Sequence, residues 1–333
     1  MRKYSVIVPV YNRPNEVDEL LESLTQQTLT NFEVLIIEDG STDKCEEVVR
    51  KYESQLDLQY FYKENSGQGF SRNFGFEKAS GDYYIVFDSD CIIPPHYFQA
   101  VEDYLNEHPL DAFGGPDKAH VSFTNVQKAI SYSMTSPFTT GGIRGNKKHV
   151  GTFHPRSFNM GISKEVYETT QGYLITRMGE DIEFSIRILE AGFKVGLIED
   201  AYVYHKRRTN FRQFYKQLHF FGRARINVSR FYSKELRLVH TFPALFTLGL
   251  LFYAFSWFIH PQLFMLGSAL LGLFIILNFL DSAIKNKSIS VAILSVIAAF
   301  TQLTAYGVGF LTEGRRKLFG APSPEKVRTL NFK

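Results

Sequence analysis

Cysteine is scarce in this chain: Cys45 and Cys91 are the only two among 333 residues. Two isolated cysteines give no disulfide framework and fit a reducing compartment. The N-terminus also lacks the pattern of a secretory signal peptide. Arg2 and Lys3 are followed by an apolar stretch that ends at Val10, which is too short for such a signal. We therefore expect the part of the chain before its first long apolar run to remain in the cytoplasm.

Charged residues are missing from two long stretches, because no Asp, Glu, Lys or Arg occurs in residues 238–280 or in residues 288–312. A transmembrane helix needs about 20 apolar residues to cross a hydrocarbon core of about 30 Å. The first stretch is long enough for two helices that fold back on one another. The sequence predicts membrane helices at about residues 238–259, 262–280 and 289–311, with buried core helices of a soluble protein as the alternative.

A basic segment precedes the first apolar run. Residues 206–237 contain ten Lys or Arg and a single acid, although the net charge of the whole chain is only +3. Within it, residues 210–232 predict a helix with aromatic side chains on one side, which suits the membrane–water interface. Basic residues beside a span favour the cytoplasmic side. We expect residues 1–205 to form a cytoplasmic domain on a multi-pass protein of the inner membrane, and no nucleic acid as a partner.

The tail, residues 313–333, conflicts with three spans. Three crossings would place it outside, whereas its Lys and Arg residues favour the cytoplasmic side. The third apolar segment contains Gly307 and Gly309, so it could be re-entrant or lie in the interface. The sequence leaves this open.

The first half of the chain alternates between strand and helix patterns. Apolar runs rich in β-formers occur at residues 4–10, 33–37, 58–62 and 83–87, each followed by a polar cluster and then an amphipathic helix. This alternation predicts an α/β fold with a mostly parallel sheet flanked by helices. The polar clusters should then meet at the carboxyl edge of the sheet, where ligands bind in such folds. A last strand is expected at 195–204.

Two acids follow the fourth predicted strand in the pattern Asp88-Ser89-Asp90. Carboxylates at this spacing can share one Mg²⁺ or Mn²⁺, which leaves other positions to water and substrate phosphates. An isolated Asp-x-Asp pattern is more often a polar turn, so the neighbouring motifs decide its meaning.

Two common nucleotide-binding motifs are absent. Gly67-Gln68-Gly69 has Arg72 where a dinucleotide fingerprint needs its third glycine, and no Gly-Lys-Ser/Thr pattern occurs. A nucleotide bound without either motif still needs a partner for its base, donors for its phosphates and usually a metal. Asp39 could accept from a base, and Arg72 could pair with phosphate.

The order and spacing of four motifs resemble family 2 glycosyltransferases with the GT-A fold. These motifs are Val8–Arg13, Glu38–Asp43, Ser71–Gly75 and Asp88–Asp90. The resemblance implies a metal-dependent, inverting transfer of a sugar from a nucleotide-diphosphate sugar, with UDP- or GDP-sugars as the expected donors. It places Asp39 at the base, Asp88 near the ribose or metal and Asp90 as the main metal ligand.

The same resemblance assigns further roles. Pro9, Tyr11 and Arg13 would contact the donor nucleotide. Glu180 and Asp181 match the acidic pair that carries the catalytic base, although acids are common in a first helical turn for dipole reasons alone.

Four other assignments are weaker. His205 would reach the metal or diphosphate, or else be structural. Asn159 would contact the sugar or make a turn or strand hydrogen bond. Gln217 and Arg223 would approach the diphosphate on the acceptor side.

The expected function is therefore a membrane-anchored inverting glycosyltransferase that uses a lipid-linked or glycan acceptor. Alternatives are a polyprenyl-phosphate sugar synthase, a processive polysaccharide synthase or a non-enzymatic nucleotide-sugar sensor. The Gln-x-x-Arg-Trp motif of processive relatives is missing from residues 217–223. Residues 135–150, rich in Gly, Thr and Lys, are expected to form an acceptor-side loop.

Overall fold

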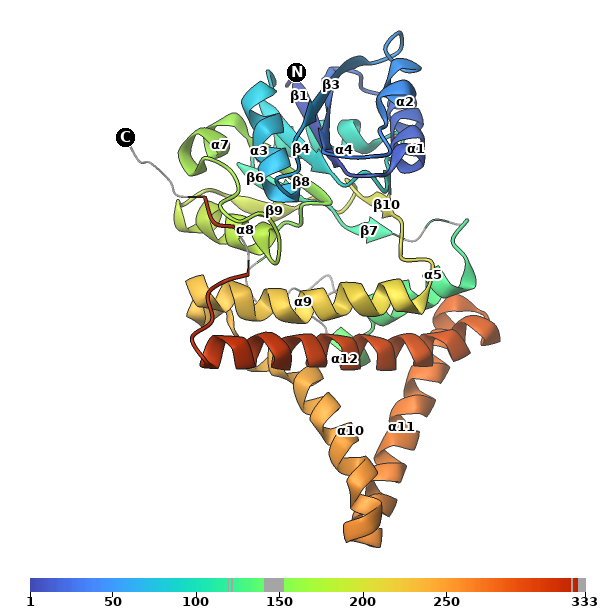
Figure 1. Cartoon of the computed structure of the whole chain (residues 1–333). Coiled ribbons are helices and arrows are strands. Elements are labelled where there is room, and N and C mark those ends of the chain that lie inside the picture. The colour runs from blue at the N-terminus through green and yellow to red at the C-terminus, as the bar shows by residue number, and fades with distance from the viewer. Residues whose placement is uncertain (119, 121, 141–152, 325, 329–333) are drawn as a thin grey trace. The chain divides into compact units, whose positions relative to one another are not determined.

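The computed structural model describes residues 1–118, 120, 122–140, 153–324 and 326–328 (Figure 1). These residues form two compact units. The first contains the described parts of 1–120, 153–206 and 326–328, and the second contains those of 122–140 and 207–324.

The first unit is built on a central sheet whose described strands follow the order β3-β2-β1-β4-β8-β6-β9. Strands β3, β2, β1 and β4 are parallel, while β8 runs antiparallel between β4 and β6. The expected mostly parallel sheet is therefore confirmed. The strand bounds are β1 Tyr4–Val10, β2 Phe32–Asp39, β3 Asp57–Lys63, β4 Tyr83–Phe87, β6 Ala112–Gly114, β8 Asn159–Ser163 and β9 Val195–Leu197.

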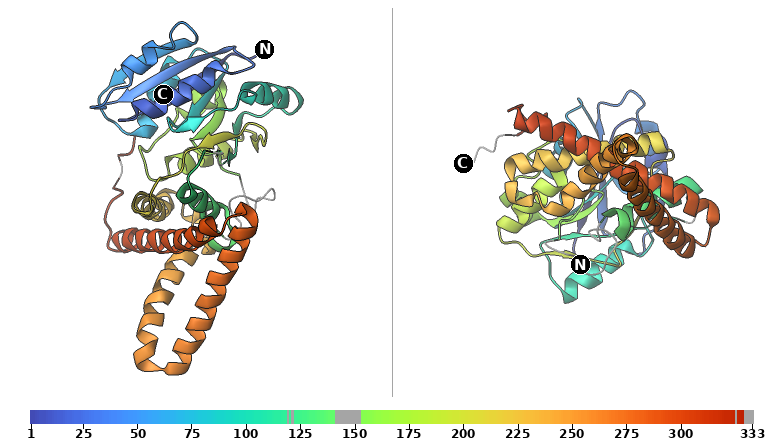
Figure 2. Two further views of the ribbon diagram at one scale, coloured as in Figure 1. Left: turned by 90° about the vertical axis from the view of Figure 1, so that its right-hand side faces the viewer. Right: turned by 90° about the horizontal axis from the view of Figure 1, so that it is seen from below.

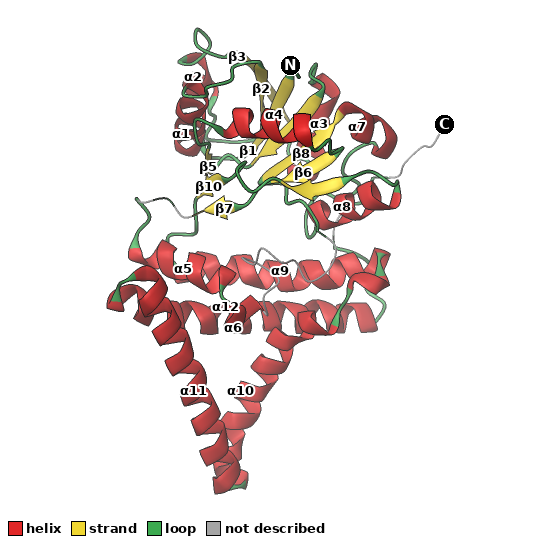
Figure 3. Cartoon of the chain, turned by 180° about the vertical axis from the view of Figure 1, so that it is seen from behind, coloured by secondary structure: helices red, strands yellow, loops and turns green. Residues whose placement is uncertain are grey.

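Helices cover both faces of this sheet (Figure 3). Alternate residues of a strand point to opposite faces, so Val6 and Val8 of β1 pack with Leu20 and Phe98, whereas Ile7 packs with Phe76. Burial on both faces explains why this strand is a nearly continuous apolar run, with Ser5 as its one polar residue. The helix bounds are α1 Pro14–Thr25, α2 Glu46–Arg50, α3 Gln68–Lys78, α4 Tyr97–Glu107, α7 Lys164–Thr170 and α8 Glu180–Glu190.

A small second sheet corrects the expected last strand. Instead of one strand over 195–204, β9 ends at Leu197, and the chain turns before β10 (Val203–His205) begins. Strand β10 pairs with β5 (Cys91–Ile92) and β7 (Asp117–Lys118), and His205 stands opposite Cys91. This pairing brings His205 beside the Asp-x-Asp motif.

The second unit is helical. Its described helices are α5 Asn125–Thr135, α6 Pro137–Thr140, α9 Phe211–Phe231, α10 Phe242–Ile259, α11 Pro261–Asn286 and α12 Ile289–Leu318, with short 3-10 turns at Ser233–Glu235 and Leu238–Thr241. Among the described residues, three helical stretches are long and apolar enough to cross a membrane: Leu238–Ile259, Pro261–Asn286 and Ile289–Leu318. The left view of Figure 2 shows α10 and α11 as a hairpin.

The expected loop at 135–150 is described only in part. Thr135 ends α5 and residues 137–140 form α6, so this part is mostly helical, and the rest of the predicted loop lies outside the described residues. The glycines at 307 and 309 do not interrupt α12, which is continuous from Ile289 to Leu318.

Candidate functional site

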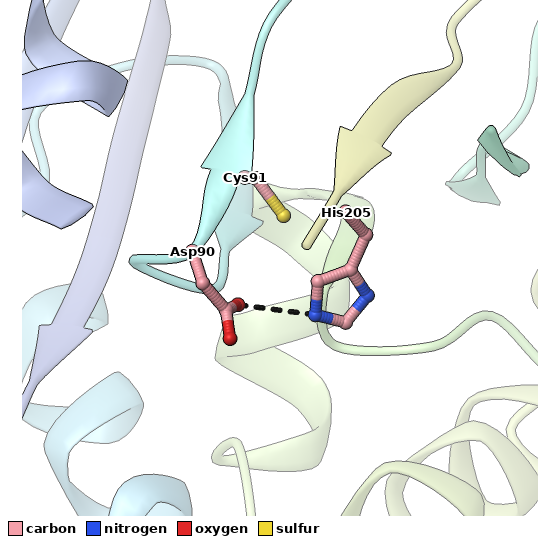
Figure 4. Close-up of side chains that lie close together, drawn as sticks. All are labelled: Asp90, Cys91 and His205. Atoms are coloured by element: carbon pink, nitrogen blue, oxygen red, sulfur yellow. Dashed lines mark ion pairs between the residues drawn. The ribbon is translucent and has the colours of Figure 1, made fainter. Parts of the chain in front are cut away.

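The acids that follow β4 lie close to the end of β10. Asp90 Oδ1 is 3.0 Å from His205 Nε2, and Asp88 Oδ2 is 3.9 Å from the same nitrogen. Figure 4 shows the Asp90 carboxylate facing the imidazole ring. The His205 ring stacks on Phe158 at 4.9 Å between ring centroids. Residues more than 100 positions apart in sequence are thus gathered by the pairing of β5 with β10.

These groups suit a divalent cation. Donor atoms of Asp90, Cys91 and His205 lie within 4.8 Å of one another. Burial raises the pKa of the Cys91 thiol well above its usual value, and its Sγ lies 3.5 Å from the Phe158 carbonyl oxygen. A thiol is also a soft donor, whereas Mg²⁺ and Mn²⁺ prefer oxygen ligands, so Cys91 is a poor ligand for either ion. Asp88, Asp90 and His205 remain as the donors, two carboxylates and an imidazole, which fit Mn²⁺ well and Mg²⁺ through their oxygens.

The loop after β1 reaches this cluster through Arg13. Its guanidinium donates to Asp90 Oδ2 at 2.6 Å. The Asn12 side chain accepts from the backbone N–H groups of Thr42 and Asp43 at 2.8 and 3.0 Å, and so joins this loop to the one after β2. Pro9 lies near the end of β1, and the Tyr11 side chain is 53% exposed next to it. An exposed aromatic ring in this loop is available for stacking.

Arg72 on α3 links the acids of two elements. The residue is only 1% exposed, and its guanidinium donates to Asp88 at 2.9 Å and to Glu180 at 3.2 Å. The ring of Tyr173 lies 5.4 Å from its central carbon. The sequence suggested phosphate as its partner, whereas the structure gives it two carboxylates. Its first effect is to hold the Asp88 and Glu180 side chains in place.

Glu180 and Asp181 begin α8 but have different surroundings. Burial raises the pKa of Glu180, and the neighbouring Asp181 carboxylate raises it further. Burial alone would also raise the pKa of Asp181, but the Arg156 guanidinium, 3.0 Å away, together with Arg72 and the Ile182 backbone N–H, outweighs burial and holds this pKa below its usual value. The side chain of Asp181 keeps 19% exposure. Asp181 is therefore ionised and reachable, while Glu180 is buried.

Arg156 and Lys63 are two cations of the site that the sequence patterns did not single out. Lys63, the last residue of β3, donates from Nζ to Asp39 at 2.5 Å. Its position at the carboxyl end of a strand was a usable signal, since all the other polar clusters share that edge. Arg156 forms an isolated β-bridge with Asn159, and its approach to Asp181 is a tertiary contact that no local pattern marks.

Asp39 is buried, and both of its carboxylate oxygens accept hydrogen bonds. Oδ1 accepts from Lys63 and from the Ser66 backbone N–H at 2.9 Å, and Oδ2 accepts from the Gly67 backbone N–H at 2.9 Å. Burial raises the pKa of a carboxyl, but these donors more than offset it and the pKa of Asp39 lies below its usual value. Asp39 thus holds the loop before α3. Carboxylate oxygens have further lone pairs for a ligand.

Asn159 is fully buried at the start of β8. Its Oδ1 accepts from the Tyr97 hydroxyl at 2.6 Å, and its Nδ2 donates to the Ala201 carbonyl at 2.7 Å. Both ends of the amide are used within the fold. This supports the structural alternative for Asn159 over a sugar contact.

Gln217 and Arg223 lie on α9 in the second unit. Arg223 donates to Glu313 of α12 at 3.2 Å. Gln217 is half-buried. Their suggested role beside the diphosphate stays a prediction.

Comparison with known proteins gives a consistent assignment. The family model described as "Glycosyl transferase family 2" matches residues 5–170. An uncharacterized glycosyltransferase of Rickettsia bellii is 46% identical over 144 residues, which cover 43% of this chain and 20% of that protein. Glycosyltransferase AglE of Haloferax volcanii is 25% identical over 256 residues, or 74% of this chain and 81% of that protein. The matches to the first three curated relatives span only 15–23% of those proteins' lengths.

Among solved structures, the mannosyltransferase PcManGT from Pyrobaculum calidifontis, in complex with GDP-Man and Mn²⁺, matches with a TM-score of 0.57. The match covers 96% of this chain and 87% of that one at 16% identity. At that identity the likeness concerns the fold, and the fold of the first unit is the GT-A fold expected from the sequence.

Proposed function

Residues 5–170 are a glycosyl transferase family 2 domain of a glycosyltransferase, and on that premise we propose that the chain transfers a sugar, with inversion, from a nucleotide-diphosphate sugar to an acceptor at a membrane surface. The observation that carries the proposal is that Asp88 and Asp90 lie beside His205, while Arg72 pairs Asp88 with Glu180, the neighbour of Asp181.

The donor would bind across the carboxyl ends of β1, β2 and β4. Tyr11 and Asp39 would receive the base, and Arg13 would turn from Asp90 toward the diphosphate. Asp88, Asp90 and His205 would hold Mg²⁺ or Mn²⁺, which when bound offsets the negative charge of the departing diphosphate. Arg13 pairs with Asp90 in this structure, and Arg13 would be replaced by the metal as the cation beside this carboxylate when the donor binds.

Asp181 would act as the general base. Its ionised carboxylate would take the proton of the acceptor hydroxyl as that oxygen forms its bond to the anomeric carbon. The bond from this carbon to the diphosphate oxygen would break on the opposite face, and its electron pair would leave with the nucleotide diphosphate. Glu180, buried against Arg72, would support the position of α8 rather than exchange the proton.

The apolar helices of the second unit support an acceptor near a bilayer. A soluble acceptor would not need α10 and α11, whose large side chains are exposed. A lipid-linked sugar or glycan, or polyprenyl phosphate itself, fits this location. We propose that the protein is anchored in the inner membrane with its first unit in the cytoplasm, since the basic segment before α10 favours that side.

Release of nucleotide from purified full-length protein in detergent tests the proposal. UDP- and GDP-sugars would be offered with Mn²⁺ or Mg²⁺, with and without a bacterial lipid extract. GDP-mannose with Mn²⁺ is the first pair to try, because the solved protein of similar fold binds both. We expect release from one donor, raised by lipid and lost on chelation.

The variant Asp90→Ala tests the proposed cation site. Calorimetry should show that it no longer binds the donor nucleotide in a metal-dependent way, whereas substitution of the exposed Glu165 by Gln should leave binding unchanged. Wild-type binding by the Asp90 variant would refute the assignment of the cation site. Absence of donor binding by the wild-type protein would refute the proposed function.

A further inference from the structure

The helices α10 and α11 expose their apolar side chains nearly all round. Phe255, Phe258 and Leu266 are 64%, 83% and 57% exposed. In the most apolar 18 residues of the helical stretches that contain α10 and α11, only 17% and 6% of the residues are buried. The 18 residues of α10 extend over about 27 Å at about 1.5 Å per residue, which matches the hydrocarbon core of a bilayer. The hairpin has the length and the surface of two membrane spans.

Helix α12 is different, because half of the residues in its most apolar stretch are buried. It packs lengthwise against α9 in Figures 1 and 3. A β-carbon on Gly309 would lie 2.1 Å from the His219 carbonyl oxygen, and one on Gly222 would lie 2.1 Å from that of Tyr306. Gly309 is therefore a contact point with α9, and Gly307 is one with α10, where a β-carbon would lie 2.3 Å from the Pro243 carbonyl oxygen.

Helix α9 lacks the composition of a membrane span. Its 21 residues include five Lys or Arg side chains, which are costly inside a bilayer. Phe214 of α9 packs with Ala298 of α12, and Lys317 at the other end donates to the Ser229 carbonyl at 2.9 Å. The two helices are joined from one end to the other, so α12 shares the environment of α9.

Buried charge in this pair supports the same environment. Glu313 of α12 is fully buried and pairs with Arg230 at 2.8 Å and Arg223 at 3.2 Å, both on α9. Two and three residues further on, Arg315 and Arg316 are exposed. The opposite side of α12 exposes Ile289, Ile293 and Ile297 at four-residue spacing, as in helices that lie in the plane of a membrane interface.

The end of the chain gives an independent argument. Val327 forms an antiparallel bridge with Ile175, and the Arg328 backbone N–H donates to the Leu174 carbonyl at 2.7 Å. Both partners belong to the first unit, as does Lys206 before the helices begin. A chain that leaves one side of a membrane and returns to it crosses an even number of times. Three spans are incompatible with this bridge, and two are compatible.

We propose that the α10–α11 hairpin is the transmembrane anchor and that α12 lies in the interface beside α9, on the side of the first unit. This rests on the membrane anchoring proposed above. The basic residues before α10, between α11 and α12 and after α12 then all lie on one side, as the positive-inside rule requires. The conflict between three apolar segments and a basic tail disappears.

Single cysteines in the full-length protein test this topology. Ser233→Cys marks the chain before the hairpin, His260→Cys its tip, Lys287→Cys the turn after α11, and Phe319→Cys the end of α12. The parent protein is the labelling control, because Cys45 and Cys91 are buried. A membrane-impermeant maleimide would be added to intact spheroplasts and to inverted membrane vesicles of the expression host.

We expect labelling at position 260 alone in spheroplasts, and at positions 233, 287 and 319 in inverted vesicles. Labelling of positions 260 and 319 together in spheroplasts would establish three spans and overturn the proposal. Protection of position 260 in spheroplasts would show that the hairpin does not cross, which also overturns it. Release of the wild-type chain from membranes by carbonate would instead refute the anchoring, and loss of sugar transfer would leave the labelling pattern unchanged.

Discussion

The two units both bury carboxylates against arginines, but carboxylates outnumber arginines in one cluster and arginines outnumber the carboxylate in the other. In the first unit, the described cluster contains four carboxylates, Asp88, Asp90, Glu180 and Asp181, paired with three arginines. In the second unit a single carboxylate, Glu313, faces three arginines. The exposed fraction also differs, because the Asp88 side chain is 35% exposed and that of Glu313 is 0% exposed.

On the proposed function, this difference separates a reactive cluster from a structural one. An excess of carboxylate that solvent can reach attracts a cation and offers a base. A carboxylate enclosed by arginines is satisfied internally, and it fixes the helices that supply them. The predictions below test whether the two clusters respond to substitution in these two different ways.

The largest effect is expected for Asp181→Asn. A positioned general base contributes about 10²–10⁴-fold to the rate of a reaction, so transfer should fall by that factor, whereas donor binding persists because Asn keeps the shape of the side chain. Single-turnover transfer and donor calorimetry measure the two quantities separately. A rate within about threefold of wild type would remove Asp181 from the chemistry.

The second cluster should respond through stability. Removing one partner of a buried ion pair costs about 3–5 kcal/mol, since the remaining charges stay buried. Glu313→Gln should therefore lower the free energy of unfolding in detergent by about 3 kcal/mol, measured by chemical denaturation. The matched control is Arg316→Gln, because this arginine is 47% exposed and 3.6 Å from Glu313, where a pair contributes about 1 kcal/mol or less. Equal losses in both variants would contradict the structural role of the cluster.

Much of the fold follows from local patterns in the sequence. The apolar runs of β1 and β4 and the polar residues after them predict the parallel core and its functional edge. The antiparallel strand β8 and the separation of β9 from β10 were not predictable, because they depend on pairs such as His205 with Cys91, far apart in the chain. The third apolar segment shows the same limit, since its composition permits a span and only tertiary contacts, its packing on α9 and the bridge of Val327 with Ile175, argue against one.

The site was predictable to a similar degree. Motif residues such as Asp90 and Asp181 stand at strand or helix ends, where spacing and resemblance identify them. Asn159 was open between two roles, because the sequence does not reveal that Tyr97 and Ala201 occupy both ends of its amide. The Arg156 contact with Asp181 depends on a tertiary approach that no local pattern encodes.

The smallest effect, and the most informative about the reactive cluster, is expected for Arg156→Gln. Asp181 acts as a base only when ionised, and Arg156 holds the pKa of this carboxyl below its usual value. Removing the guanidinium should raise that pKa, so the acidic limb of the kcat profile should move to higher pH. Well above both pKa values, the rate should approach that of the wild type.

Arg156→Lys is the control, since it keeps a positive charge near the carboxylate and should move the limb less. The sign is the decisive feature. A limb that stays in place while the rate falls at every pH would mean that Arg156 only supports the loop before β8. A limb that moves to lower pH would contradict the pairing itself. If the limb moves to higher pH in Arg156→Gln but little in Arg156→Lys, charge is the property by which Arg156 acts. That result would also place Asp181 in the proton transfer, because a loss of stability alone does not move the limb.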